Sequence, residues 1–597
     1  MLSGRRRIIL PILIATFAAR LAVGGPRPSI TFQRDVAPII YRHCAVCHQP
    51  GQAGPFSLLN YDDVKRHARQ IARVTQIGYM PPWLPEHSYG DFEGEQRLTN
   101  AEIRTIADWV AEGSPEGDGR AAQAAPEIVA DGWRLGKPDL VLRAGEPLRV
   151  PAGSADVFWN FTFRPQLSKA RYVKGLEIRP GGGGALVHHA NLLIDRTHST
   201  DRLEAKAGSG FPGMELTLNR NPLDPPSHFL FWKPGTTPHF EQAGFAWRLD
   251  PGNVLVLNTH LQPSGKPEEV QPEIALYFTD EAPTRFPLLV ELEADNSLDI
   301  PAGTRDFPVG DDFKLPIDVD VLAIYPHAHY LGKLLEAYAT LPDGKRVWLI
   351  RIPDWNFDWQ AVYRYKSPVA LPAGSVVSMR FHYDNSAKNV RNPNHPPKRV
   401  VAGNRASDEM AHLWLQLLPR GRGDRRRELE EAVERHRVEK DPRNFSAHLN
   451  LGALLLSRLR TQEAIDQLQT ALKLNASSAE AHDMLGSALR SVGRSQEAIG
   501  QFRAALRANP DYIEARYDLA ASLARAGDFA GAIENFRPVI EAFPNDSRLR
   551  NEWGEMLARS GDLSGALQQF EKAIQLDPAN RDAAKNRDWV LTQRAQR

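Results

Sequence analysis

The chain has 597 residues, which is too long for one hydrophobic core and predicts several domains. Its formal net charge is only +1, so its charge does not favour a nucleic acid as partner, and we expect none. With 42% hydrophobic and 24% charged residues, the composition is that of an ordinary folded protein.

The first residues are typical of an export signal. Arg5, Arg6 and Arg7 precede an apolar stretch over residues 8–23, which ends in small residues. We therefore predict a signal peptide over residues 1–24 and an extracytoplasmic protein, either periplasmic or secreted. The alternative is an uncleaved anchor, although this stretch is short for a helix that spans a bilayer.

The two cysteines of the chain, Cys44 and Cys47, are followed by His48 in the pattern CAVCH. In a c-type haem attachment motif, two thiols bond the porphyrin covalently and the following histidine ligates iron. A redox pair or half of a zinc site is the alternative interpretation. The motif predicts haem c as a cofactor that Cys44, Cys47 and His48 hold.

The segments around this motif have helical patterns. Residues 32–42 can place three apolar side chains on one helix face, and a second helix is expected over 99–112 with Thr99 as its N-cap. Between them, Met80 opens a proline-rich loop with the sequence MPPW. Such a loop is a rigid way to present a thioether, so we predict Met80 as the sixth iron ligand.

Three histidines, His43, His67 and His87, are the alternatives for the role of sixth ligand. Helix, haem motif, methionine loop and closing helix together resemble a small α-helical class I cytochrome c domain, which would cover residues 28–116. The chain then becomes polar and rich in alanine, and we assign residues 117–131 to a linker.

Beyond residue 131 the pattern changes to short apolar runs broken by proline and glycine. Such spacing without long helical periodicity predicts all-β sandwich architecture. The runs cover residues 158–163, 254–257, 274–278, 321–324 and 376–381.

Candidate metal ligands fall in this β-rich part of the chain. His327 and His329 are two residues apart, so on a strand they point to one face and reach one metal together. Adjacent His188 and His189 point to opposite faces of a regular strand, so they share a metal only at a strand end or a bulge. A run of glycines just upstream favours irregular backbone there. Taken alone, a histidine such as His260 is more often a surface or core residue than a ligand.

With Met410, these five histidines form two groups of three. One group has three imidazoles, and the other has two imidazoles and a thioether. Copper suits both groups, because imidazole serves both of its oxidation states and a thioether favours Cu(I). The pattern predicts two copper ions and the activation of O2.

Four motifs in this part of the chain resemble those of the copper type II, ascorbate-dependent monooxygenases, the family of the peptidylglycine and dopamine hydroxylases. They are VHHANLL at 187–193, FWKPG at 231–235 followed by LDPGNVLVLNTH at 249–260, HAHYLGK at 327–333, and SDEM at 407–410. Four motifs in the same order are much more specific than any one of them alone.

This resemblance implies two jelly-roll-like β-sandwich domains, over 132–285 and 286–420, each with one copper site. It also implies the ligands. An electron-relay copper would be held by His188, His189 and His260, and an oxygen-binding copper by His327, His329 and Met410.

The activity of such enzymes is also implied. The two metals supply electrons one at a time, O2 reacts at the methionine-ligated copper, and a C–H bond of the substrate is hydroxylated. The expected reductant is an ascorbate-like molecule or a redox protein.

The sequence departs from this family in two ways. Animal members carry many disulfides, whereas both cysteines here belong to the haem motif. In the peptide-amidating branch, an arginine two positions before the HxH pair grips the carboxylate of the peptide, and that position is Tyr325 here. We therefore expect a small organic substrate other than a peptidylglycine. Tyr325, Tyr330 and Trp414 are candidates for a substrate pocket, but buried aromatic residues of a sandwich are more often core.

A repeat of 34 residues occupies the last part of the chain. Small and apolar residues recur in phase, and prolines keep the same period. This is the tetratricopeptide pattern, which predicts an α-solenoid over 421–597 with about four repeats at 443–583. Its concave surface is expected to hold a protein partner, and the alternative is a stabilising or dimerising appendage. The recurring residues are Leu451-Gly452, Leu485-Gly486, Leu519-Ala520 and Trp553-Gly554, then Ala464, Ala498, Ala532 and Ala566, and Pro442, Pro510, Pro544 and Pro578.

Together these features predict a multidomain monooxygenase in which the haem domain feeds electrons to the coppers. Two other classes remain open. One is an extracytoplasmic electron-transfer or copper-handling protein without hydroxylase activity, and the other is a scaffold whose repeats carry the function.

Overall fold

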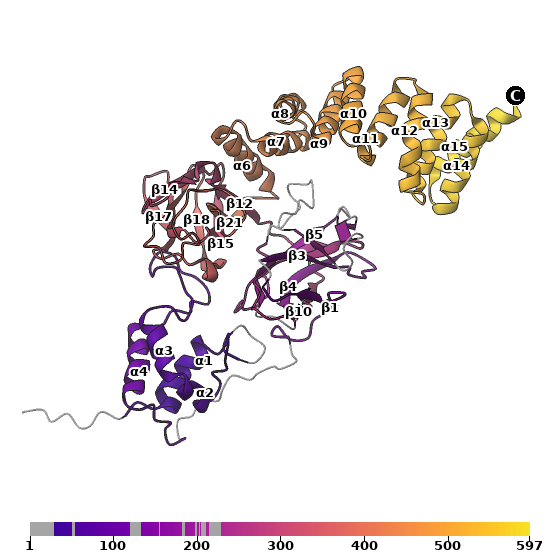
Figure 1. Cartoon of the computed structure of the whole chain (residues 1–597). Coiled ribbons are helices and arrows are strands. Elements are labelled where there is room, and N and C mark those ends of the chain that lie inside the picture. The colour runs from indigo at the N-terminus through magenta and orange to yellow at the C-terminus, as the bar shows by residue number, and fades with distance from the viewer. Residues whose placement is uncertain are drawn as a thin grey trace, which may run out of the picture. The chain divides into compact units, whose positions relative to one another are not determined.

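The computed structural model describes residues 29–49, 54–119, 133–153, 156–181, 186–196, 200–201, 203–204, 210–213 and 228–596 (Figure 1). The predicted signal peptide and most of the predicted linker lie outside these residues. The described chain divides into two compact units. One comprises residues 29–82 and 96–119, and the other comprises residues 83–95 and those from 133 onward.

The first unit is helical. Its last helix begins at the predicted N-cap, where Thr99 and Glu102 exchange side chain to backbone hydrogen bonds in a capping box. Ile106 and Trp109 of that helix are fully buried in one core with Ile40. The elements are the π-helical turn η1 (Phe32–Val36) and the helices α1 (Ala37–His43), α2 (Tyr61–Arg66), α3 (Ala68–Gln76) and α4 (Asn100–Ala111).

Residues 140–279 form the first β region, whose antiparallel sheets have the strand orders β1-β11-β4-β8, β10-β2 and β6-β3-β9-β5-β7. Strand β9 lies in the middle of the five-stranded sheet and is buried along almost its whole length, as its apolar sequence VLVLNTHL predicts. The strands are β1 (Leu140–Arg143), β2 (Leu148–Val150), β3 (Val157–Phe163), β4 (Arg171–Arg179), β5 (Val187–Asp195), β6 (Phe211–Pro212), β7 (Phe231–Trp232), β8 (Trp247–Leu249), β9 (Val254–Leu261), β10 (Glu268–Val270) and β11 (Glu273–Thr279).

Residues 288–419 form the second β region, with the strand orders β12-β21-β15-β18, β14-β19-β16-β17 and β13-β20. The two four-stranded sheets share one core, to which Leu415 belongs from one sheet and Phe381 from the other. The strands are β12 (Leu288–Glu293), β13 (Asp299–Ile300), β14 (Phe307–Lys314), β15 (Val319–His327), β16 (Gly332–Thr340), β17 (Arg346–Ile352), β18 (Tyr363–Leu371), β19 (Val376–Tyr383), β20 (Val400–Val401) and β21 (His412–Pro419).

The prediction of a β-rich central part is confirmed, because all five predicted apolar runs lie within strands. In β14, buried and exposed residues alternate, as expected of a strand with one face on a core. Asp311 occupies one of the inward positions of this strand and is 6% exposed. A charged residue at such a position requires polar partners, and these come from the helix that follows the β region.

Residues 83–95, which we call the strap, pack on the second β region. The backbone N–H of Glu93 donates to the carbonyl of Arg364 at 2.8 Å, which attaches the strap beside β18. Phe92 is 2% exposed and belongs to the core of the second β region, and Trp83 packs against that core. Nothing in the sequence predicted this packing, since the strap lies inside the range assigned to the haem domain.

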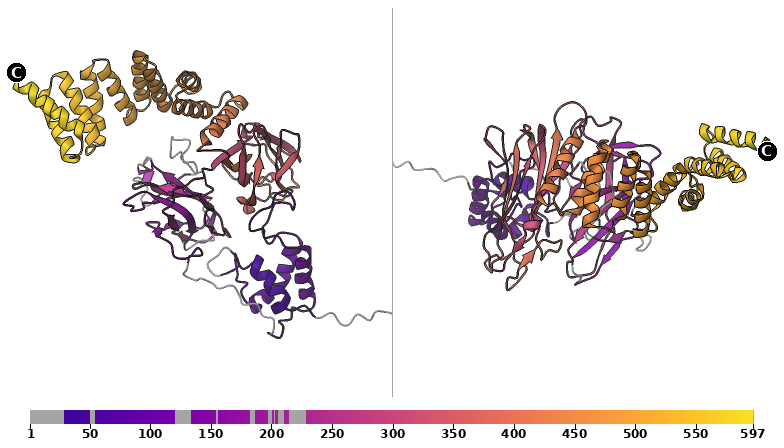
Figure 2. Two further views of the ribbon diagram at one scale, coloured as in Figure 1. Left: turned by 180° about the vertical axis from the view of Figure 1, so that it is seen from behind. Right: turned by 90° about the horizontal axis from the view of Figure 1, so that it is seen from above.

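The remaining chain is a series of helices that pack side by side in sequence order (Figures 1 and 2). Leu429 and Val433 of α6 belong to the core of the second β region, so this helix is anchored on the strands that precede it. The helices are α6 (Arg426–Lys440), α7 (Phe445–Ser457), α8 (Thr461–Leu474), α9 (Ala479–Ser491), α10 (Ser495–Ala508), α11 (Ile513–Arg525), α12 (Phe529–Ala542), α13 (Ser547–Ser560), α14 (Leu563–Leu576) and α15 (Arg581–Ala595).

The 34-residue repeat corresponds to helix pairs from α7/α8 to α13/α14. A Cβ atom on Gly486 would lie 2.6 Å from the ring of Phe502, and Gly554 stands in the same relation to Phe570. The small residues therefore let the paired helices approach, and the predicted solenoid is confirmed. Helix α10 ends two residues before Pro510, as expected of a residue that cannot continue a helix. Among the described helices, none combines the length and apolar character that crossing a membrane requires.

Candidate metal centres

The first histidine cluster, His188, His189 and His260, lies on the adjacent strands β5 and β9 of the first β region. The register of β5 against β9 shifts between Val187 and His189, so His188 is an extra residue in its strand. A bulge is one of the two arrangements, with a strand end, that the sequence left open for a shared metal, although most of the glycine run upstream lies outside the described residues. The bulge turns both adjacent imidazoles toward His260, and each ring centroid lies 5.2 Å from the centroid of His260.

The three imidazoles converge closely enough to share one ion. One nitrogen of each ring lies within 4.8 Å of those of the other two. The Nδ1 atoms of His188 and His189 are 3.1 Å apart, and because two lone pairs repel at this distance, a proton or a cation has to lie between them. His260 Nε2 is 2.9 Å from Oδ2 of Asp156. This carboxylate keeps the proton on Nε2 and leaves Nδ1 as a ligand atom.

Burial favours the neutral form of these imidazoles. Burial, followed by the charges of His260 and Lys233, lowers the pKa of His188 to about 4. Burial and then His188 lower the pKa of His189 well below its usual value. Burial also lowers the pKa of His260, although Asp156 opposes this effect. Because the neutral imidazole is the metal-binding form, the cluster suits a metal ion better than a shared proton.

The second histidine cluster comprises His327 and His329, whose ring centroids are 5.3 Å apart. His327 is the last residue of β15, and His329 lies beyond the end of that strand. The two rings therefore meet, as predicted, but the expectation that both lie on one strand is wrong. The chain turns out of the sheet directly after His327.

Hydrogen bonds select the same ring nitrogen in both residues of the second cluster. His327 Nδ1 is 2.8 Å from Oε1 of Gln360, and His329 Nδ1 is 3.0 Å from the carbonyl oxygen of Asp408. Both partners only accept, so each Nδ1 carries the proton and each Nε2 offers a lone pair. Burial is the largest cause that lowers the pKa of both histidines, which favours the neutral form here as well.

A buried acidic side chain, that of Glu409, joins Met410 to this cluster. Glu409 is 0% exposed, and it accepts hydrogen bonds from the backbone N–H groups of His329 at 2.8 Å, Leu331 at 2.6 Å and Met410 at 3.2 Å. Burial raises the pKa of Glu409 to about 8, although these hydrogen bonds act in the opposite direction. Tyr383 donates to the carbonyl of Met410 at 2.6 Å. The backbone of Met410 is therefore held on both sides, and its side chain is buried.

A positively charged histidine lies beside the second cluster. His412 is paired with His327 across β21 and β15, and their ring centroids are 6.1 Å apart. Burial alone would lower the pKa of His412, but Asp295 and Glu291 outweigh burial and raise it to about 9. At neutral pH His412 is therefore an imidazolium and not a metal ligand.

His412 also forms a close group with Glu291 and Glu293, which have potential metal-binding atoms. This group already has cationic partners. Arg437 of α6 lies 2.9 Å from Glu291, and the carbonyl of Glu293 accepts from Lys440. We therefore assign it to an ion-pair network between α6 and the second β region.

One aromatic ring contacts both histidine clusters. Phe357, in the 3₁₀ turn η4 (Phe357–Trp359), is 3% exposed, and its ring centroid lies 5.3 Å from that of His188 and 5.4 Å from that of His329. The ring of Tyr330 also packs against Phe357, with the two ring centroids 4.9 Å apart. A buried ring at this place excludes water from the space that it fills.

The other aromatic candidates lie near the second cluster and outside the apolar core of their region. Tyr325 contacts Phe231 at 5.3 Å between ring centroids and donates a hydrogen bond to Gln360 at 2.6 Å. Trp414 is paired with Tyr325 across β21 and β15 and is half-buried. The expectation that buried aromatic residues belong to the apolar core is therefore not met by Tyr325, Tyr330 or Trp414, none of which is part of that core.

The CAVCH motif forms a single turn after α1. The backbone N–H groups of Cys47 and His48 both donate to the carbonyl of Cys44, and the two cysteines form no disulfide. Burial, and then Cys47, raises the pKa of Cys44 to about 12. His48 Nδ1 is 3.1 Å from the carbonyl of Phe56, which leaves Nε2 as a ligand atom. A Cβ atom on Gly54 would lie 2.8 Å from His48 Nδ1, so the loop closely fixes this ring.

The candidates for the sixth iron ligand differ in their surroundings. Met80 is half-buried, and its N–H donates to the carbonyl of Val74 in α3. Nδ1 of His43 is hydrogen-bonded to the carbonyl oxygen of Gln96, at a distance of 3.1 Å. His67 is stacked on Phe56, which in turn contacts His48, and His87 lies on the exposed part of the strap.

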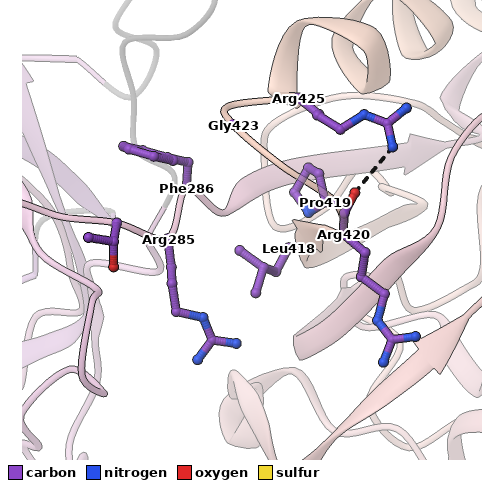
Figure 3. A pocket seen from close by; sticks show the side chains of 9 residues that line it. Arg285, Phe286, Leu418, Pro419, Arg420, Gly423 and Arg425 are labelled. Atoms are coloured by element: carbon purple, nitrogen blue, oxygen red, sulfur yellow. Dashed lines mark hydrogen bonds between the residues drawn. The ribbon is translucent and has the colours of Figure 1, made fainter.

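A surface cavity of about 350 Å³ lies among residues 284–286 and 418–425 (Figure 3). Three arginines line it, but Arg420 pairs with Asp320 at 3.0 Å and Arg425 pairs with Glu428 at 2.7 Å. The guanidinium group of Arg285 lies over the ring of Phe245, 4.6 Å from its centroid. Since all three guanidinium groups already have partners, we assign no ligand to this cavity.

The sequence-based reasoning missed Asp156, Gln360 and Glu409, which hydrogen-bond to the histidine clusters. Each binds a partner that is distant in sequence, with separations of 104, 33 and 80 residues. Of these three residues, only Glu409 could have been suspected from the sequence, because it directly precedes the candidate ligand Met410 in the motif SDEM.

The comparisons with known proteins concern the C-terminal helices. Residues 426–479, 454–513, 483–536 and 517–581 match the tetratricopeptide repeat family, so this part of the chain consists of tetratricopeptide repeats. No curated protein matches the chain.

Several solved structures are similar to part of the chain. MamA has 26% identity, over 26% of this chain and 89% of MamA, with a TM-score of 0.25. YrrB, described as a repeat protein of this kind with an unusual peptide-binding site, has 23% identity over 27% of this chain and 84% of YrrB, with a TM-score of 0.26. MamA from Desulfovibrio magneticus, from residue 41 to its end, has 22% identity over 25% of this chain and 85% of that chain, with a TM-score of 0.25.

Proposed function

We propose that this chain is a copper-dependent monooxygenase that uses O2 to hydroxylate a C–H bond of a small organic substrate. The observation that carries the proposal is the approach of His188 Nδ1 and His189 Nδ1 to 3.1 Å, with His260 beside them. Three neutral imidazoles at this spacing match a ligand set that copper accepts in both oxidation states.

The two clusters have different roles in this proposal. His188, His189 and His260 hold an electron-relay copper, and His327, His329 and Met410 hold an oxygen-binding copper. Bound copper supplies one-electron redox chemistry and the activation of O2. The protein orients the ligands.

Three carboxyl or amide groups perform that orientation. Asp156 and Gln360 each bond the ring nitrogen of a histidine that does not face the metal. Glu409 holds the segment of Met410 against the loop of His329. Phe357 packs against one histidine of each cluster, which restricts the orientation of both rings.

The N-terminal unit is proposed to be a class I cytochrome c domain. Cys44 and Cys47 would attach haem c, and His48 and Met80 would ligate its iron. The haem would supply one-electron transfer to the copper sites, instead of or together with an ascorbate-like reductant. The predicted signal peptide implies that the chain works outside the cytoplasm.

The β regions are proposed to be jelly-roll-like copper domains, over 132–285 and 286–420. The tetratricopeptide repeats offer a surface for a protein partner. The substrate is proposed to be small and organic, because Tyr325 replaces the arginine that grips a peptide carboxylate in the amidating enzymes.

Metal analysis of the purified, haem-loaded full chain tests this function. The wild type should hold two copper ions per chain, and Met410→Ala and His260→Ala should each lose or weaken one. Oxygen uptake with ascorbate should require both sites. No copper, or binding indifferent to both substitutions, would exclude a monooxygenase, whereas two coppers without oxygen uptake would indicate a copper-handling protein.

A further inference from the structure

The loop that carries His329 lies outside the strands and is nevertheless buried. Residues 328–331 connect β15 to β16. His329 is 2% exposed, and Ala328 and Leu331 belong to the core of the second β region. Within a sheet, neighbouring strands pair the backbone N–H and carbonyl groups, but a buried loop needs other partners for them. Side chains therefore have to supply part of the hydrogen bonding that fixes this loop.

One tryptophan binds the loop at both of its ends. The indole N–H of Trp355 donates to the carbonyl oxygens of Ala328 and His329, at 3.2 and 3.1 Å. Its backbone N–H donates to the carbonyl oxygen of Lys333 at 2.7 Å. Trp355 is 1% exposed, so water does not compete for these acceptors. The chain between Ala328 and Lys333 is thus closed by hydrogen bonds to a single residue.

Gly332 allows the indole to approach the loop this closely. A Cβ atom on this residue would lie 2.7 Å from Cδ1 of Trp355 and 2.9 Å from Cβ of Ala328. Both distances are shorter than the contacts that side-chain atoms make in a packed core. Any larger residue would therefore displace the indole or the loop, which explains the glycine of the motif HAHYLGK in physical terms.

The chain that follows Trp355 contacts both histidines of the second cluster. The ring of Phe357 packs on that of His329, with the centroids 5.4 Å apart. Oε1 of Gln360 lies 2.8 Å from Nδ1 of His327. One short segment thus contacts the backbone of the loop through its first residue, and both imidazoles through the residues that follow.

We propose that Trp355 is a positioning residue of the second histidine cluster, because it fixes the backbone from which His329 extends. This inference rests on the proposed function, in which His329 is a ligand. Glu409 accepts from N–H groups of the loop, whereas Trp355 donates to its carbonyl groups, so the two residues hold the loop in complementary ways. A ligand has to be held within about 0.5 Å of its productive position, and such support provides that precision.

The test uses the full chain with Cu(II) as the probe. The second copper is followed in a His260→Ala background and the first in a Met410→Ala background, by competition with a chelator. Trp355→Phe keeps a ring in the core and removes the indole N–H. The affinity for the second copper should fall about tenfold, which is the usual effect of losing a group that supports a ligand. The affinity for the first should stay the same, and amide hydrogen exchange at residues 329–332 of the metal-free chain should become faster.

Two further variants separate positioning from general destabilisation. Trp348→Phe makes the same substitution on β17, where the ring packs against Tyr338, and should leave both affinities and the exchange of the loop unchanged. Gly332→Ala should reproduce the loss of affinity while the indole itself is intact, because the added Cβ atom displaces it from the carbonyl groups. The free energy of unfolding is measured for each variant, so that affinities are compared among folded proteins.

The outcomes distinguish this inference from the proposed function. A folded Trp355→Phe chain that is less stable but binds the second copper as tightly as the wild type would overturn the positioning role. An equal loss of affinity at both coppers, or in Trp348→Phe, would also overturn it, because the substitution would then act on the whole fold. A wild-type chain that binds no copper would overturn the proposed function and, with it, the role of Trp355 in holding a ligand.

Discussion

The two β regions assemble their histidine clusters in different ways. In the first, all three imidazoles lie on neighbouring strands, and a bulge at His188 brings them together. In the second, the imidazoles lie at a strand end and in a loop, and Glu409 ties that loop to the segment of Met410. The first cluster depends on strand register, whereas the second depends on the buried carboxyl group of Glu409 and on segments from elsewhere in the chain.

The second β region also incorporates chain from both sides. The strap contributes Phe92 to its core, and α6 contributes Leu429 and Val433. A region that shares its core with preceding and following segments depends on those segments for part of its stability. The comparison teaches that the second cluster lies in the β region whose packing involves more of the chain.

The largest expected effect is that of Glu409→Ala. The substitution leaves three backbone N–H groups in the second cluster without an acceptor, which costs about 4 kcal/mol of stability. Faster amide hydrogen exchange at residues 328–332 and loss of one copper should follow, with the first cluster unaffected. Glu409→Gln, which keeps an acceptor, should show a smaller effect. Unchanged exchange in the alanine variant would contradict the role of this carboxylate.

Removal of a histidine from the first cluster should affect the first copper and leave the second cluster unchanged. His260→Ala is expected to lower the affinity for the first copper more than about 100-fold, which exceeds the usual effect of residues that only support a ligand. The second copper and the exchange pattern of the second β region should be unchanged. Competition with a chelator measures both affinities. His382→Ala, a histidine outside the clusters, is the control, and an equal loss there would contradict the assignment.

The attachment of α6 to the second β region should depend on pH. Burial alone would raise the pKa of Asp311, but hydrogen bonds from His436 and Lys440 outweigh burial and lower it to about 2. Because the folded pKa lies below the unfolded value, this carboxylate stabilises the fold above about pH 4, and the contribution is lost as the pH falls toward 2.

Asp311→Asn should therefore cost about 2 kcal/mol near neutral pH and almost nothing near pH 2. Denaturant unfolding followed by exchange of the α6 amides measures the difference. Asp312→Asn is the matched control, because Asp312 is half-exposed on the same strand and pairs with Arg380 at 2.8 Å. A pH-independent difference between Asp311→Asn and the wild type would contradict the proposed linkage.

The smallest expected effect is the loss of copper affinity when a residue that only orients a ligand is substituted. Asp156→Ala should weaken only the first copper, by about tenfold, because the carboxylate is 39% exposed and water can replace it. Gln360→Ala should weaken only the binding of the second copper. This loss of affinity should be larger than that caused by Asp156→Ala, because Gln360 is 1% exposed and water cannot readily replace its side chain. Copper titration of both variants tests this order. If Asp156→Ala affected both sites equally, the clusters would not be independent.

The sequence by itself determined the elements whose contacts are local. The repeat of 34 residues predicted the C-terminal solenoid, because a small residue packs closely against the neighbouring helix in successive pairs, as Gly486 does against Phe502 and Gly554 against Phe570, and the period records that contact. Apolar runs predicted strands such as β9 and β15, and the adjacency of His188 and His189 limited a shared metal to a strand end or a bulge, of which the structure has the bulge. Haem, copper and the activity stay predictions.

Only the tertiary structure decided which distant residues meet. Phe92 lies against Tyr365, and Asp156 against His260, through pairings of segments far apart in the chain. Such contacts leave no periodicity in the sequence, since each requires the fold to bring two unrelated segments together. For the same reason the end of β15 at His327 and the buried position of Glu409 became visible only in the folded chain, where burial and strand register are set together.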